Sequence, residues 1–427
     1  MKVAIAGYGQ EGDANYRYWS SLGADVEIFD EKEPSWQPPE NAKLYVGTDA
    51  FFLMNDFDLV VRTAGLNPNK IHTNSKVWSA TNEFFEKCPA PIIGVTGTKG
   101  KGTTCSLIAE ILKTAGKTVH LVGNIGVSAL DVLPEVAVDD LVVFELSSFQ
   151  LWDLKKSPET AVVLMIEPDH QDIHASMAEY VEAKANIAKF QHADDLLIYH
   201  PTNAFSAEVA SKSSAQKKQY QSPEGACVRG QDIVIDGNVI CSKSEVGLIG
   251  PHNLDNICAA ITASWNYTQD IVAIKQAVIR FKGLPHRLEF VREVDGVKYY
   301  NDSFSAAPGA AVAAMQAFEV PEIFICGGYS RGLDFTELAK AFARQKNVKK
   351  VVLIGQTRNS IAEALAKNNF DMTAVTEAAD LNEAVSMCKS SAAAGDVVVL
   401  SPGCPSFDMF KNFYDRGDQF KRIVEEL

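Results

Sequence analysis

The segment Gly94-Val-Thr-Gly-Thr-Lys-Gly-Lys-Gly-Thr-Thr104 carries residue types that bind a nucleoside triphosphate. An apolar run precedes it and a pattern with helical spacing follows. Glycines let backbone N–H groups approach phosphate oxygens, and the N-terminus of the following helix adds a positive dipole end. Lys101 is predicted to reach the outer phosphates. Thr103 is the candidate hydroxyl for Mg²⁺, because Gly102 occupies the slot directly after the lysine. The alternative is a glycine-rich turn with a chance lysine.

A second candidate group surrounds a carboxylate at the end of an apolar strand. The run 141–150 places Glu145 where ligands sit in open parallel sheets, beside the phosphate loop, with Ser147 two residues on. Glu145 is therefore predicted to hold Mg²⁺; the alternative is a buried glutamate in a structural ion pair. His170 follows the next strand and is a candidate ligand for a second Mg²⁺, oriented by Asp169, although imidazole is an unusual ligand for so hard an ion. Packing is the competing interpretation of this histidine.

Lys184 lies in the amphipathic segment 177–190. The helical pattern alone places its side chain on a solvated face. Nothing local separates it from Lys189, so the residues by themselves predict an ordinary surface lysine.

The segment Gly250-Pro-His-Asn-Leu-Asp-Asn256 opens a predicted helix. Asn253 or Asp255 could cap that helix. Asparagine side chains also pair well with an adenine edge, but helix capping is the interpretation that chemistry alone favours.

Polar clusters follow several predicted strands in the last third of the chain. They lie at 301–303, 327–332 and 400–408. We expect these loops to form a second ligand site, in which Arg331 could bind a carboxylate through its planar guanidinium.

The first strand is followed by Gly7-Tyr-Gly-Gln-Glu-Gly12, and Asp30 closes the second strand. This pattern is the dinucleotide fingerprint. NAD binding therefore stays open, with another diphosphate as the favoured occupant of the loop.

These residues require alternating strands and helices to position them. We predict an α/β protein of three domains: 1–88, Rossmann-like; 89–282, with a mostly parallel P-loop sheet; and 283–427, Rossmann-like. Expected strands are 2–7, 25–30, 59–62, 91–96, 118–123, 140–145, 161–166, 195–199, 288–300, 322–326, 350–354 and 396–400. Expected helices are 15–22, 252–266, 271–282, 308–318, 335–345, 357–367, 380–390 and 407–426, and 217–247 is expected to be a small antiparallel insert.

Composition narrows the class of protein. The 427 residues carry 40 basic and 54 acidic side chains, a net charge of −14, which argues against nucleic acid or an anionic membrane as the main partner. The start of the chain is a predicted strand rather than a leader, and no apolar run approaches the roughly 20 residues of a membrane span. The 8 cysteines are scattered without any Cys-x-x-Cys pair. A cytoplasmic protein, expected to be a monomer, fits these features.

Taken together, the motifs resemble those of the Mur ligase family, and within it the branch that adds D-glutamate. The resemblance runs through all three predicted domains. Its segments are Gly97–Thr104, Gly123-Asn-Ile-Gly126, Glu145-Leu-Ser-Ser-Phe-Gln-Leu151, His170, Ala183-Lys184, His252–Asn256, Leu284–Glu289, Asn301-Asp-Ser303 and Leu400–Phe420. The resemblance implies an ATP-dependent ligase of peptidoglycan precursor synthesis, with UDP-N-acetylmuramoyl-L-alanine and D-glutamate as its other substrates.

The resemblance also implies a role for each matching residue. ATP contacts would be Gly97, Thr98, Lys99, Gly100, Lys101, Gly102, Thr103, Thr104, Asn256, Arg287 and Asp302. UDP-substrate contacts would be Gly7, Gly9, Gly12, Asp30, Gly65, Asn124, Ser147 and Gln150. Arg331, Ser406, Phe407 and Phe413 would hold the amino acid. Thr103, Glu145, His170 and Lys184 would hold two Mg²⁺ ions, with Lys184 carbamylated by CO₂, and the catalytic residues would be Lys101, Glu145, His170 and Lys184.

The sequence departs from the family pattern around the amino-acid site. The family's lysine and Thr-Asn pair are replaced by Phe304, Ala306 and Ala307, and a further family lysine is replaced by Arg331. Glu11 is acidic where small hydroxyl residues are common. These changes bear on which amino acid is added. A Mur-type ligase for another amino acid and a folylpolyglutamate-synthase-like ligase are the alternatives, followed by an NAD-dependent oxidoreductase and a catalytically silent nucleotide-binding regulator.

Overall fold

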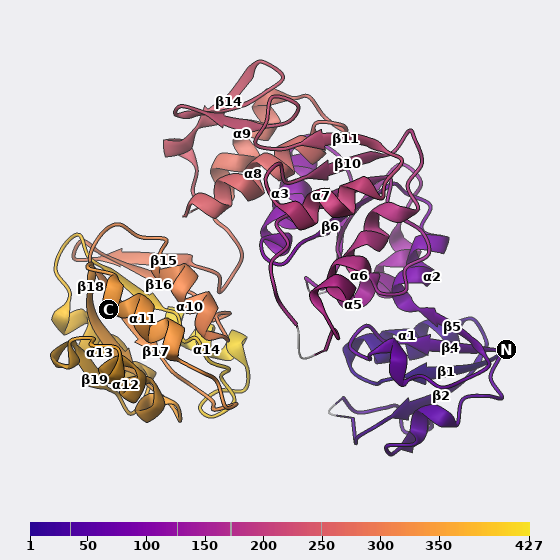
Figure 1. Ribbon diagram of the computed structural model, residues 1–427, viewed down its shortest axis with the longest axis horizontal. Coiled ribbons are helices and arrows are strands. Elements are labelled where there is room, and N and C mark those ends of the chain that lie inside the picture. The colour runs from indigo at the N-terminus through magenta and orange to yellow at the C-terminus, as the bar shows by residue number, and fades with distance from the viewer. Residues whose placement is uncertain (35, 126, 171–172, 249) are drawn as a thin grey trace. The chain divides into compact units, whose positions relative to one another are not determined.

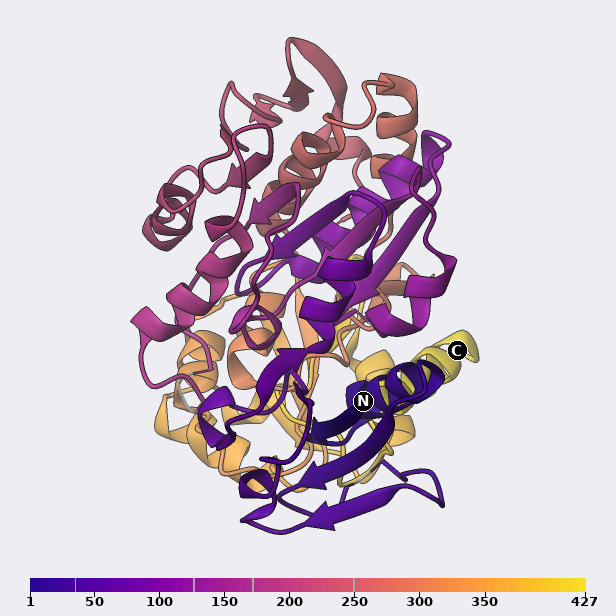
Figure 2. The same ribbon diagram turned by 90° about the vertical axis from the view of Figure 1, so that its right-hand side faces the viewer.

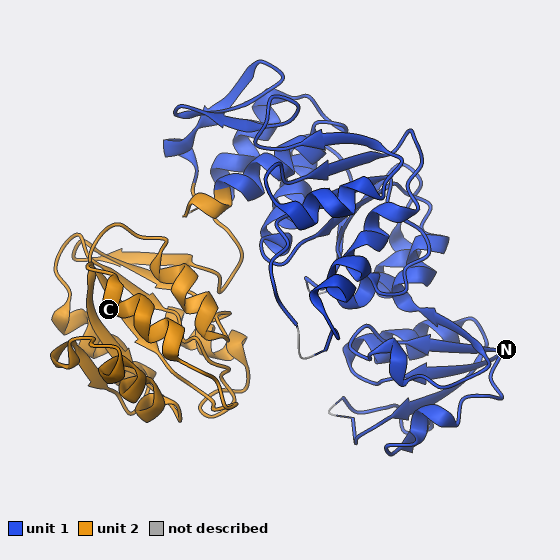
Figure 3. Ribbon diagram, viewed as in Figure 1, with its two compact units in different colours: residues 1–246, 254–281 blue, residues 247–253, 282–427 orange. Residues whose placement is uncertain are grey.

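The computed structural model describes residues 1–427 apart from Ser35, Gly126, Gln171, Asp172 and Ile249. The chain divides into two compact units (Figure 3). Unit 1 comprises residues 1–246 and 254–281, and unit 2 comprises residues 247–253 and 282–427. The predicted α/β class is confirmed, because most of the sheets are parallel and carry helices between their strands (Figure 1).

The first sheet of unit 1 lies within the predicted domain 1–88, which Figure 2 turns toward the viewer. Its strands are β1 (Lys2–Ala6), β2 (Asp25–Asp30), β3 (Lys43–Val46), β4 (Leu59–Arg62) and β5 (Lys76–Ser79), all parallel in the order β3-β2-β1-β4-β5. The helices are α1 (Gln10–Ser21) and α2 (Ala80–Lys87). The sequence analysis missed β3, β5 and α2, which are short elements of 4, 4 and 8 residues.

The predicted helix 15–22 starts earlier than expected. Helix α1 begins at Gln10, so Gly12 lies inside the helix rather than in the loop before it. Glu11 and Asp13 occupy the first turn, where carboxylates interact favourably with the helix dipole. The fingerprint loop is therefore short, and Gly9 stands at the N-cap of α1.

The second sheet of unit 1 contains the phosphate loop. Its parallel strands are β6 (Ile92–Thr96), β7 (Val119–Gly123), β8 (Leu141–Glu145), β9 (Thr160–Val163), β10 (Leu196–Tyr199) and β11 (Gln216–Gln219), in the order β11-β10-β9-β6-β8-β7. Its helices are α3 (Lys101–Thr114), α4 (Ala129–Val132), α5 (Ser148–Leu151), α6 (Met177–Lys189), α7 (Ala204–Ser211), α8 (Pro251–Ser264) and α9 (Ile271–Arg280). Because β6 pairs with β8 and β9, the loop after β6 emerges between the ends of those two strands.

The expected antiparallel insert is present but shorter than 217–247. It consists of β12 (Cys227–Arg229), β13 (Asp232–Ile235) and β14 (Asn238–Ser242), and β11 joins the parallel sheet instead. Asp236 and Gly237 both have positive φ, 49° and 76°, which the tight turn between β13 and β14 requires.

Unit 2 is built on one mixed sheet. Its strands are β15 (Glu289–Val294), β16 (Val297–Asn301), β17 (Glu322–Cys326), β18 (Val348–Leu353), β19 (Val375–Glu377) and β20 (Val397–Leu400), in the order β15-β16-β20-β17-β18-β19 with only β15 antiparallel. Helices α10 (Pro308–Met315), α11 (Thr336–Arg344) and α12 (Arg358–Lys367) pack on one face, and α13 (Leu381–Ser391) and α14 (Phe413–Glu425) pack on the other. Strand side chains alternate between these faces: Phe324 and Cys326 join one core, Ile323 and Ile325 the other.

The last predicted helix, 407–426, begins later than expected, at Phe413. The side chain of Asn412 caps it by accepting a hydrogen bond from the N–H of Asp415. The residues that precede α14 therefore form a loop at the carboxyl end of β20. The sequence analysis also missed the short strand β19.

Two sequence expectations about the chain as a whole can be compared with the structure. The cysteines of the described chain are free thiols, all buried except Cys88, which is half-buried. Among the helices that the structure describes, none combines the length and the apolar character needed to cross a membrane.

Candidate active site

The phosphate loop joins β6 to α3 through backbone positions that suit glycine. Gly100 is the N-cap of α3 with φ +84°, and a Cβ at that position would lie 2.2 Å from Asn256 Oδ1. The side chain of Lys101 curls over the loop, where Nζ donates to the carbonyl oxygens of Gly97 at 3.2 Å and Thr98 at 3.0 Å. The ammonium group therefore contacts the backbone of the loop that the sequence predicts to bind phosphates.

The other predicted ATP contacts of the loop are placed differently. The Thr98 hydroxyl donates to the carbonyl oxygen of Glu167 and accepts from its N–H, so this side chain ties the loop to the segment after β9. Lys99 is exposed, with Nζ 3.7 Å from a carboxylate oxygen of Glu167. Thr103 is partly buried in the first turn of α3 and Thr104 is fully buried.

Asn256 reaches the loop from helix α8. Its side chain is 7% exposed, and its Oδ1 accepts a hydrogen bond of 3.4 Å from the Thr104 hydroxyl. Helix α8 begins at Pro251, so Asn253 and Asp255 lie inside it and the capping interpretation is wrong. The Asp255 carboxylate instead accepts a hydrogen bond from the Gln221 side chain.

Lys184 is not on a solvated face. The side chain is 1% exposed, and Nζ donates to Gly97 O at 2.9 Å and lies 3.4 Å from Thr96 Oγ1. Burial lowers the pKa of the Lys184 amine well below its ordinary value, and the nearby Lys101 charge lowers it further. The helical pattern predicted the wrong environment for Lys184 because α6 is buried on most of its sides. Lys189 of the same helix, in contrast, forms an ion pair with Glu182 at the surface.

Glu145 ends β8 beside the start of the loop, paired in register with Val95 of β6. Its side chain is 4% exposed, and Asn124 Nδ2 lies 3.5 Å from Oε1. The other interpretation of Glu145, a buried glutamate in a structural ion pair, remains the alternative among the residues that the structure describes. Within the same described residues, no three His, Cys, Asp or Glu side chains gather as a metal cluster. Mg²⁺ is usually held by one or two carboxylates together with substrate phosphates, so a lone buried Glu145 beside the loop fits such an ion.

His170 lies close to the same region but in a more open setting. Its side chain is 45% exposed and its Nε2 lies 3.6 Å from the Asp169 carboxylate. The rings of Phe149 and Tyr180 are its neighbours, and Tyr180 also lies under the Lys184 amine, 4.6 Å from Nζ to the ring centroid. No described contact joins His170 directly to Glu145 or Lys184.

A pocket of about 330 Å³ gathers half of the predicted UDP-substrate residues. It is lined by Gln10, Glu11, Ala64, Gly65, Ala80, Thr81, Gly123, Asn124, Val127, Ser128, Ala129, Phe144, Ser147, Phe149 and Gln150. Four residues of the prediction are therefore brought together: Gly65, Asn124, Ser147 and Gln150. Ser147 and Gln150 hold each other in a capping box at the start of α5. Gly126, of the motif that contains Asn124, lies outside the described residues.

The remaining UDP-substrate residues do not line this pocket. A Cβ at Gly7, which has φ +87°, would lie 2.4 Å from Thr63 Oγ1, and one at Gly12 would lie 2.7 Å from the Gly7 carbonyl oxygen. Asp30 accepts a hydrogen bond of 2.7 Å from the N–H of Tyr8. These residues shape the loop itself, whereas a Cβ at Gly9 would meet nothing within 4 Å, so a ligand could approach there.

The sequence analysis missed Arg62, which donates hydrogen bonds to two residues that line the pocket, Ala64 and Phe149. This fully buried side chain forms two hydrogen bonds with Asp153 and donates to the carbonyl oxygens of Leu66 at 2.8 Å and Phe149 at 2.9 Å. It therefore joins the loop after β4 to helix α5. Glu11 holds the same loop through the N–H of Ala64, and burial raises the pKa of its carboxyl. An arginine at the end of an apolar strand was the signal that could have revealed this role.

In unit 2 the predicted amino-acid residues form two groups. Arg331 lies beside the exposed ring of Phe407, 5.4 Å from Cζ to the ring centroid, while Ser406 is buried. Phe413 instead packs edge-on against Phe304, with ring centroids 5.0 Å apart.

Arg416 organises the loops around these groups. It is fully buried and donates to both the hydroxyl and the carbonyl oxygen of Ser303, and to the carbonyl oxygen of Cys404. The Ser303 hydroxyl in turn donates to the carbonyl oxygen of Phe413. The sequence analysis recognised the motif that contains Arg416 but assigned this residue no role.

The predicted nucleotide contacts of unit 2, Arg287 and Asp302, are neighbours. The Asp302 carboxylate accepts from the N–H of Leu288 at 3.2 Å and from the Ser401 hydroxyl at 2.7 Å. The Arg287 guanidinium lies over the ring of Phe304, with 3.8 Å from Cζ to the centroid.

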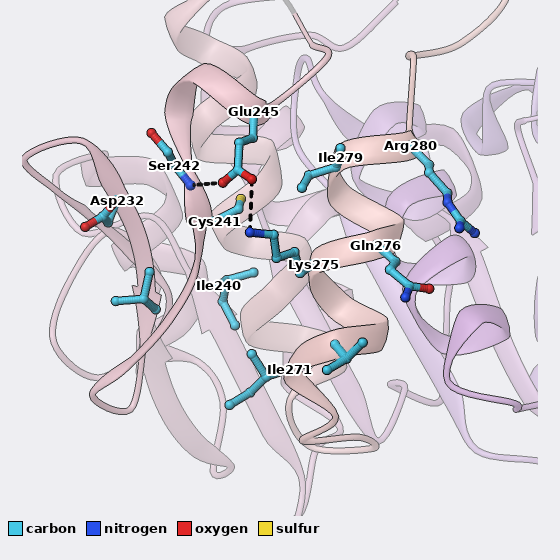
Figure 4. A pocket seen from close by; sticks show the side chains of 12 residues that line it. Asp232, Ile240, Cys241, Ser242, Glu245, Ile271, Lys275, Gln276, Ile279 and Arg280 are labelled. Carbon is cyan, nitrogen blue, oxygen red and sulfur yellow. Dashed lines mark hydrogen bonds and ion pairs between the residues drawn. The ribbon is translucent and has the colours of Figure 1, made fainter.

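A larger hollow of about 530 Å³ lies elsewhere in unit 1, between β13, β14 and α9 (Figure 4). An ion pair between Lys275 and Glu245 stands at one side of it. None of the predicted site residues lines it.

Comparisons with known proteins match most of this chain to one family. The Mur ligase middle domain matches residues 95–264, and the Mur ligase glutamate ligase domain matches residues 286–404. The UDP-N-acetylmuramoylalanine–D-glutamate ligase of Clostridium tetani is 36% identical over 446 residues, covering 100% of this chain and 97% of the relative. The ligase of the same name from Clostridium kluyveri is 36% identical over 448 residues with the same coverage.

Solved structures of low sequence identity share the fold. MurF from Acinetobacter baumannii superposes with a TM-score of 0.66 at 15% identity, covering 100% of this chain and 93% of that one. UDP-N-acetylmuramate-alanine ligase MurC from Thermotoga maritima gives a TM-score of 0.63 at 17% identity, with 100% and 99% covered. With a full-length match at 36% identity and the predicted phosphate loop in place, the chain belongs to the Mur ligase family.

Proposed function

We propose that this chain joins UDP-N-acetylmuramoyl-L-alanine to D-glutamate, at the expense of ATP, in the synthesis of peptidoglycan precursors. The observation that carries the proposal is the convergence of Lys101 and Lys184 on the Gly97 carbonyl, beside the buried Glu145. The names of the full-length relatives support the choice of substrates.

The chemical problem is that a carboxylate does not react with an amine in water. Transfer of the γ-phosphate of ATP to the carboxylate of the UDP-linked substrate gives an acyl phosphate and ADP. The amine of D-glutamate then attacks the acyl carbon, a tetrahedral intermediate forms, and phosphate leaves as the amide bond is completed. Lys101 would draw negative charge away from the transferred phosphate.

Mg²⁺ would be held by Glu145 and Thr103, with His170 and a modified Lys184 at a second ion. Bound Mg²⁺ supplies positive charge that reduces repulsion between the phosphate and the attacking carboxylate. Lys184 is suited to modification because burial lowers the pKa of its amine and so favours the neutral form. In carbamylation the nitrogen of the neutral amine bonds to the carbon of CO₂ and releases a proton, so an uncharged amine becomes an anionic carbamate.

The pocket that contains Gly65, Asn124, Ser147 and Gln150 is proposed for the UDP-linked substrate. D-glutamate would meet Arg331, whose planar guanidinium can hold a carboxylate through two hydrogen bonds. Ser406, Phe407 and Phe413 are proposed as further contacts of the amino acid. We also propose a cytoplasmic monomer of three domains, 1–88, 89–282 and 283–427.

The test is phosphate release by the full-length enzyme with ATP, UDP-N-acetylmuramoyl-L-alanine and a panel of amino acids. D-glutamate is expected to be preferred, and Lys101→Ala is expected to abolish turnover while the protein keeps its unfolding temperature. Preference for a neutral amino acid would overturn the substrate assignment but leave the ligase chemistry.

The rival functions have distinct readouts. An NAD-dependent oxidoreductase would change absorbance when NADH is added with a substrate. A silent regulator would bind ATP without releasing ADP, and either result in place of ligation would refute the proposal.

A further inference from the structure

Arg287 is presented by an unusual stretch of backbone. The two residues that flank it, His286 and Leu288, both have positive φ, 63° and 43°. Non-glycine residues rarely adopt this conformation, and it persists only where surrounding contacts hold it. The chain therefore fixes the direction of the Arg287 side chain at some conformational cost.

The contacts that hold this stretch come from the loop after β16. The N–H of Phe304 donates to the carbonyl oxygen of His286 at 3.0 Å. The Asp302 carboxylate accepts from the N–H of Leu288. The loop thus binds the backbone on both sides of Arg287, and both strained residues are tied to it.

The same loop also supports the side chain of Arg287. The guanidinium carbon lies 3.8 Å from the centroid of the Phe304 ring, within the range of a cation–π contact. The Phe304 ring is 42% exposed and is braced edge-on by Phe413. A lysine at position 304 would repel the Arg287 guanidinium because both groups are positively charged, whereas the aromatic ring of Phe304 attracts it.

Asp302 is already occupied as a hydrogen-bond acceptor. Its second oxygen accepts from the Ser401 hydroxyl at 2.7 Å, and the residue is 9% exposed. Burial raises the pKa of its carboxyl to about 7, and the two hydrogen bonds and the charges of Arg287 and Arg416 oppose that rise.

We infer that Phe304 and Asp302 are positioning residues that hold Arg287 toward the nucleotide, and that Phe304 does not select the amino acid. The Phe304 ring packs against the Arg287 guanidinium, and Asp302 binds the backbone N–H of Leu288, the residue after Arg287. The identity of the ligand that Arg287 binds, a nucleotide, rests on the proposed function.

The first test compares full-length Phe304→Leu, Phe304→Tyr, Arg287→Ala and the double variant Phe304→Leu/Arg287→Ala. Phe290→Leu is the matched control, because its ring is 48% exposed in the same unit. Phe304→Leu is expected to raise the KM for ATP by about two- to thirty-fold, the range of a cation–π contact, and to leave the KM for D-glutamate unchanged. Phe304→Tyr and the control should stay close to the wild type.

The double variant separates the two roles of Phe304. If the ring acts through Arg287, the double variant is no worse than Arg287→Ala alone. A rise in the KM for D-glutamate alone, or an effect that adds fully to that of Arg287→Ala, would overturn the inference.

An NMR measurement of the contact between Phe304 and Arg287 does not require enzymatic turnover, so it tests the inference independently of the proposed function. The Phe304 ring current should shift the Arg287 Nε–H resonance in NMR spectra, and Phe304→Leu should remove that shift while the control keeps it. An unchanged resonance would refute the contact. If the wild type failed to turn over ATP, the proposed function would fall, but this resonance would still decide whether Phe304 holds Arg287.

A second pair of variants tests Asp302. Asp302→Asn keeps an acceptor for Leu288 and a polar group for Ser401, so its KM for ATP is expected to rise less than that of Asp302→Ala. Asp302→Ala loses both contacts and should resemble Arg287→Ala. Equal damage in the two variants would show that the charge itself is needed and would exclude the positioning role.

Discussion

At the scale of single residues, two lysines of the same helix have opposite environments. Lys184 is buried against the phosphate loop, and Lys189 pairs with Glu182 at the surface. Burial of an ammonium group is unfavourable, so burial favours the neutral amine of Lys184. A neutral amine reacts with CO₂, which gives the residue a chemistry that its neighbour in sequence lacks.

Lys184→Ala is expected to lose ligase turnover because the carbamate oxygens are lost. Acetate, a small carboxylate, should restore part of the activity. In ¹³C-bicarbonate the wild type should show a carbamate NMR signal at neutral pH that Lys184→Ala lacks. Lys189→Ala is the control and should keep both the signal and the activity. An active wild-type enzyme without the carbamate signal would contradict this prediction.

At the scale of elements, the ends of strands decide where ligands can bind. Strand β4 ends in Arg62, and this side chain connects the loop after β4 to helix α5. A second arginine, Arg17 of α1, also reaches across unit 1, to Asp131 of α4. The two pairs differ in burial: Arg62 is fully buried, whereas Arg17 is 53% exposed.

Arg62→Met should destabilise the protein by about 3–5 kcal/mol, because it leaves Asp153 and several carbonyl groups without their partner. The KM for the UDP-linked substrate should rise in the same variant, since the pocket loses a wall support. Arg17→Ala should cost less than about 1 kcal/mol, as exposed ion pairs usually do. Urea unfolding and phosphate release measure both quantities. Equal costs for the two arginines would show that burial of the ion pair is not what matters.

At the scale of the whole molecule, each of the two compact units buries hydrophobic clusters of its own. Unit 2 contains Glu322, a fully buried carboxyl at the start of β17. One of its oxygens accepts a hydrogen bond from Asn347 at 2.6 Å. Burial raises the pKa of Glu322 to about 8, so the folded protein holds this proton more tightly than the unfolded chain does.

The stability of the wild type relative to Glu322→Gln should therefore fall as pH rises. Because the pKa is raised on folding, the neutral form stabilises the fold at low pH, and the loss begins above the ordinary value of 4.5 and is complete above about 8. Unfolding temperatures of both proteins between pH 5 and 9 measure the difference, with the exposed Glu337→Gln as control. A constant difference across this range would refute the raised pKa.

Local patterns in the sequence determined the main elements of the fold. Strand β6, the loop with Lys101 and helix α3 were predicted together, because apolar runs, glycines and helical spacing are properties of neighbouring residues. Glu145 was placed correctly at a strand end for the same reason. The short edge strands β3 and β5 were missed, since their pairing is decided by partners far along the chain.

The tertiary structure alone decided how the site residues are held. Lys184 is buried because α6 is enclosed by the sheet and its neighbours, Arg62 acts on residues 87 and 91 positions away, and Arg287 is directed by a loop that follows it across a hairpin. The sequence therefore determined which chemical groups are present and at which strand ends they stand. Contacts between distant segments set their burial, their pKa and their direction, because those properties depend on what the folded chain places around each group.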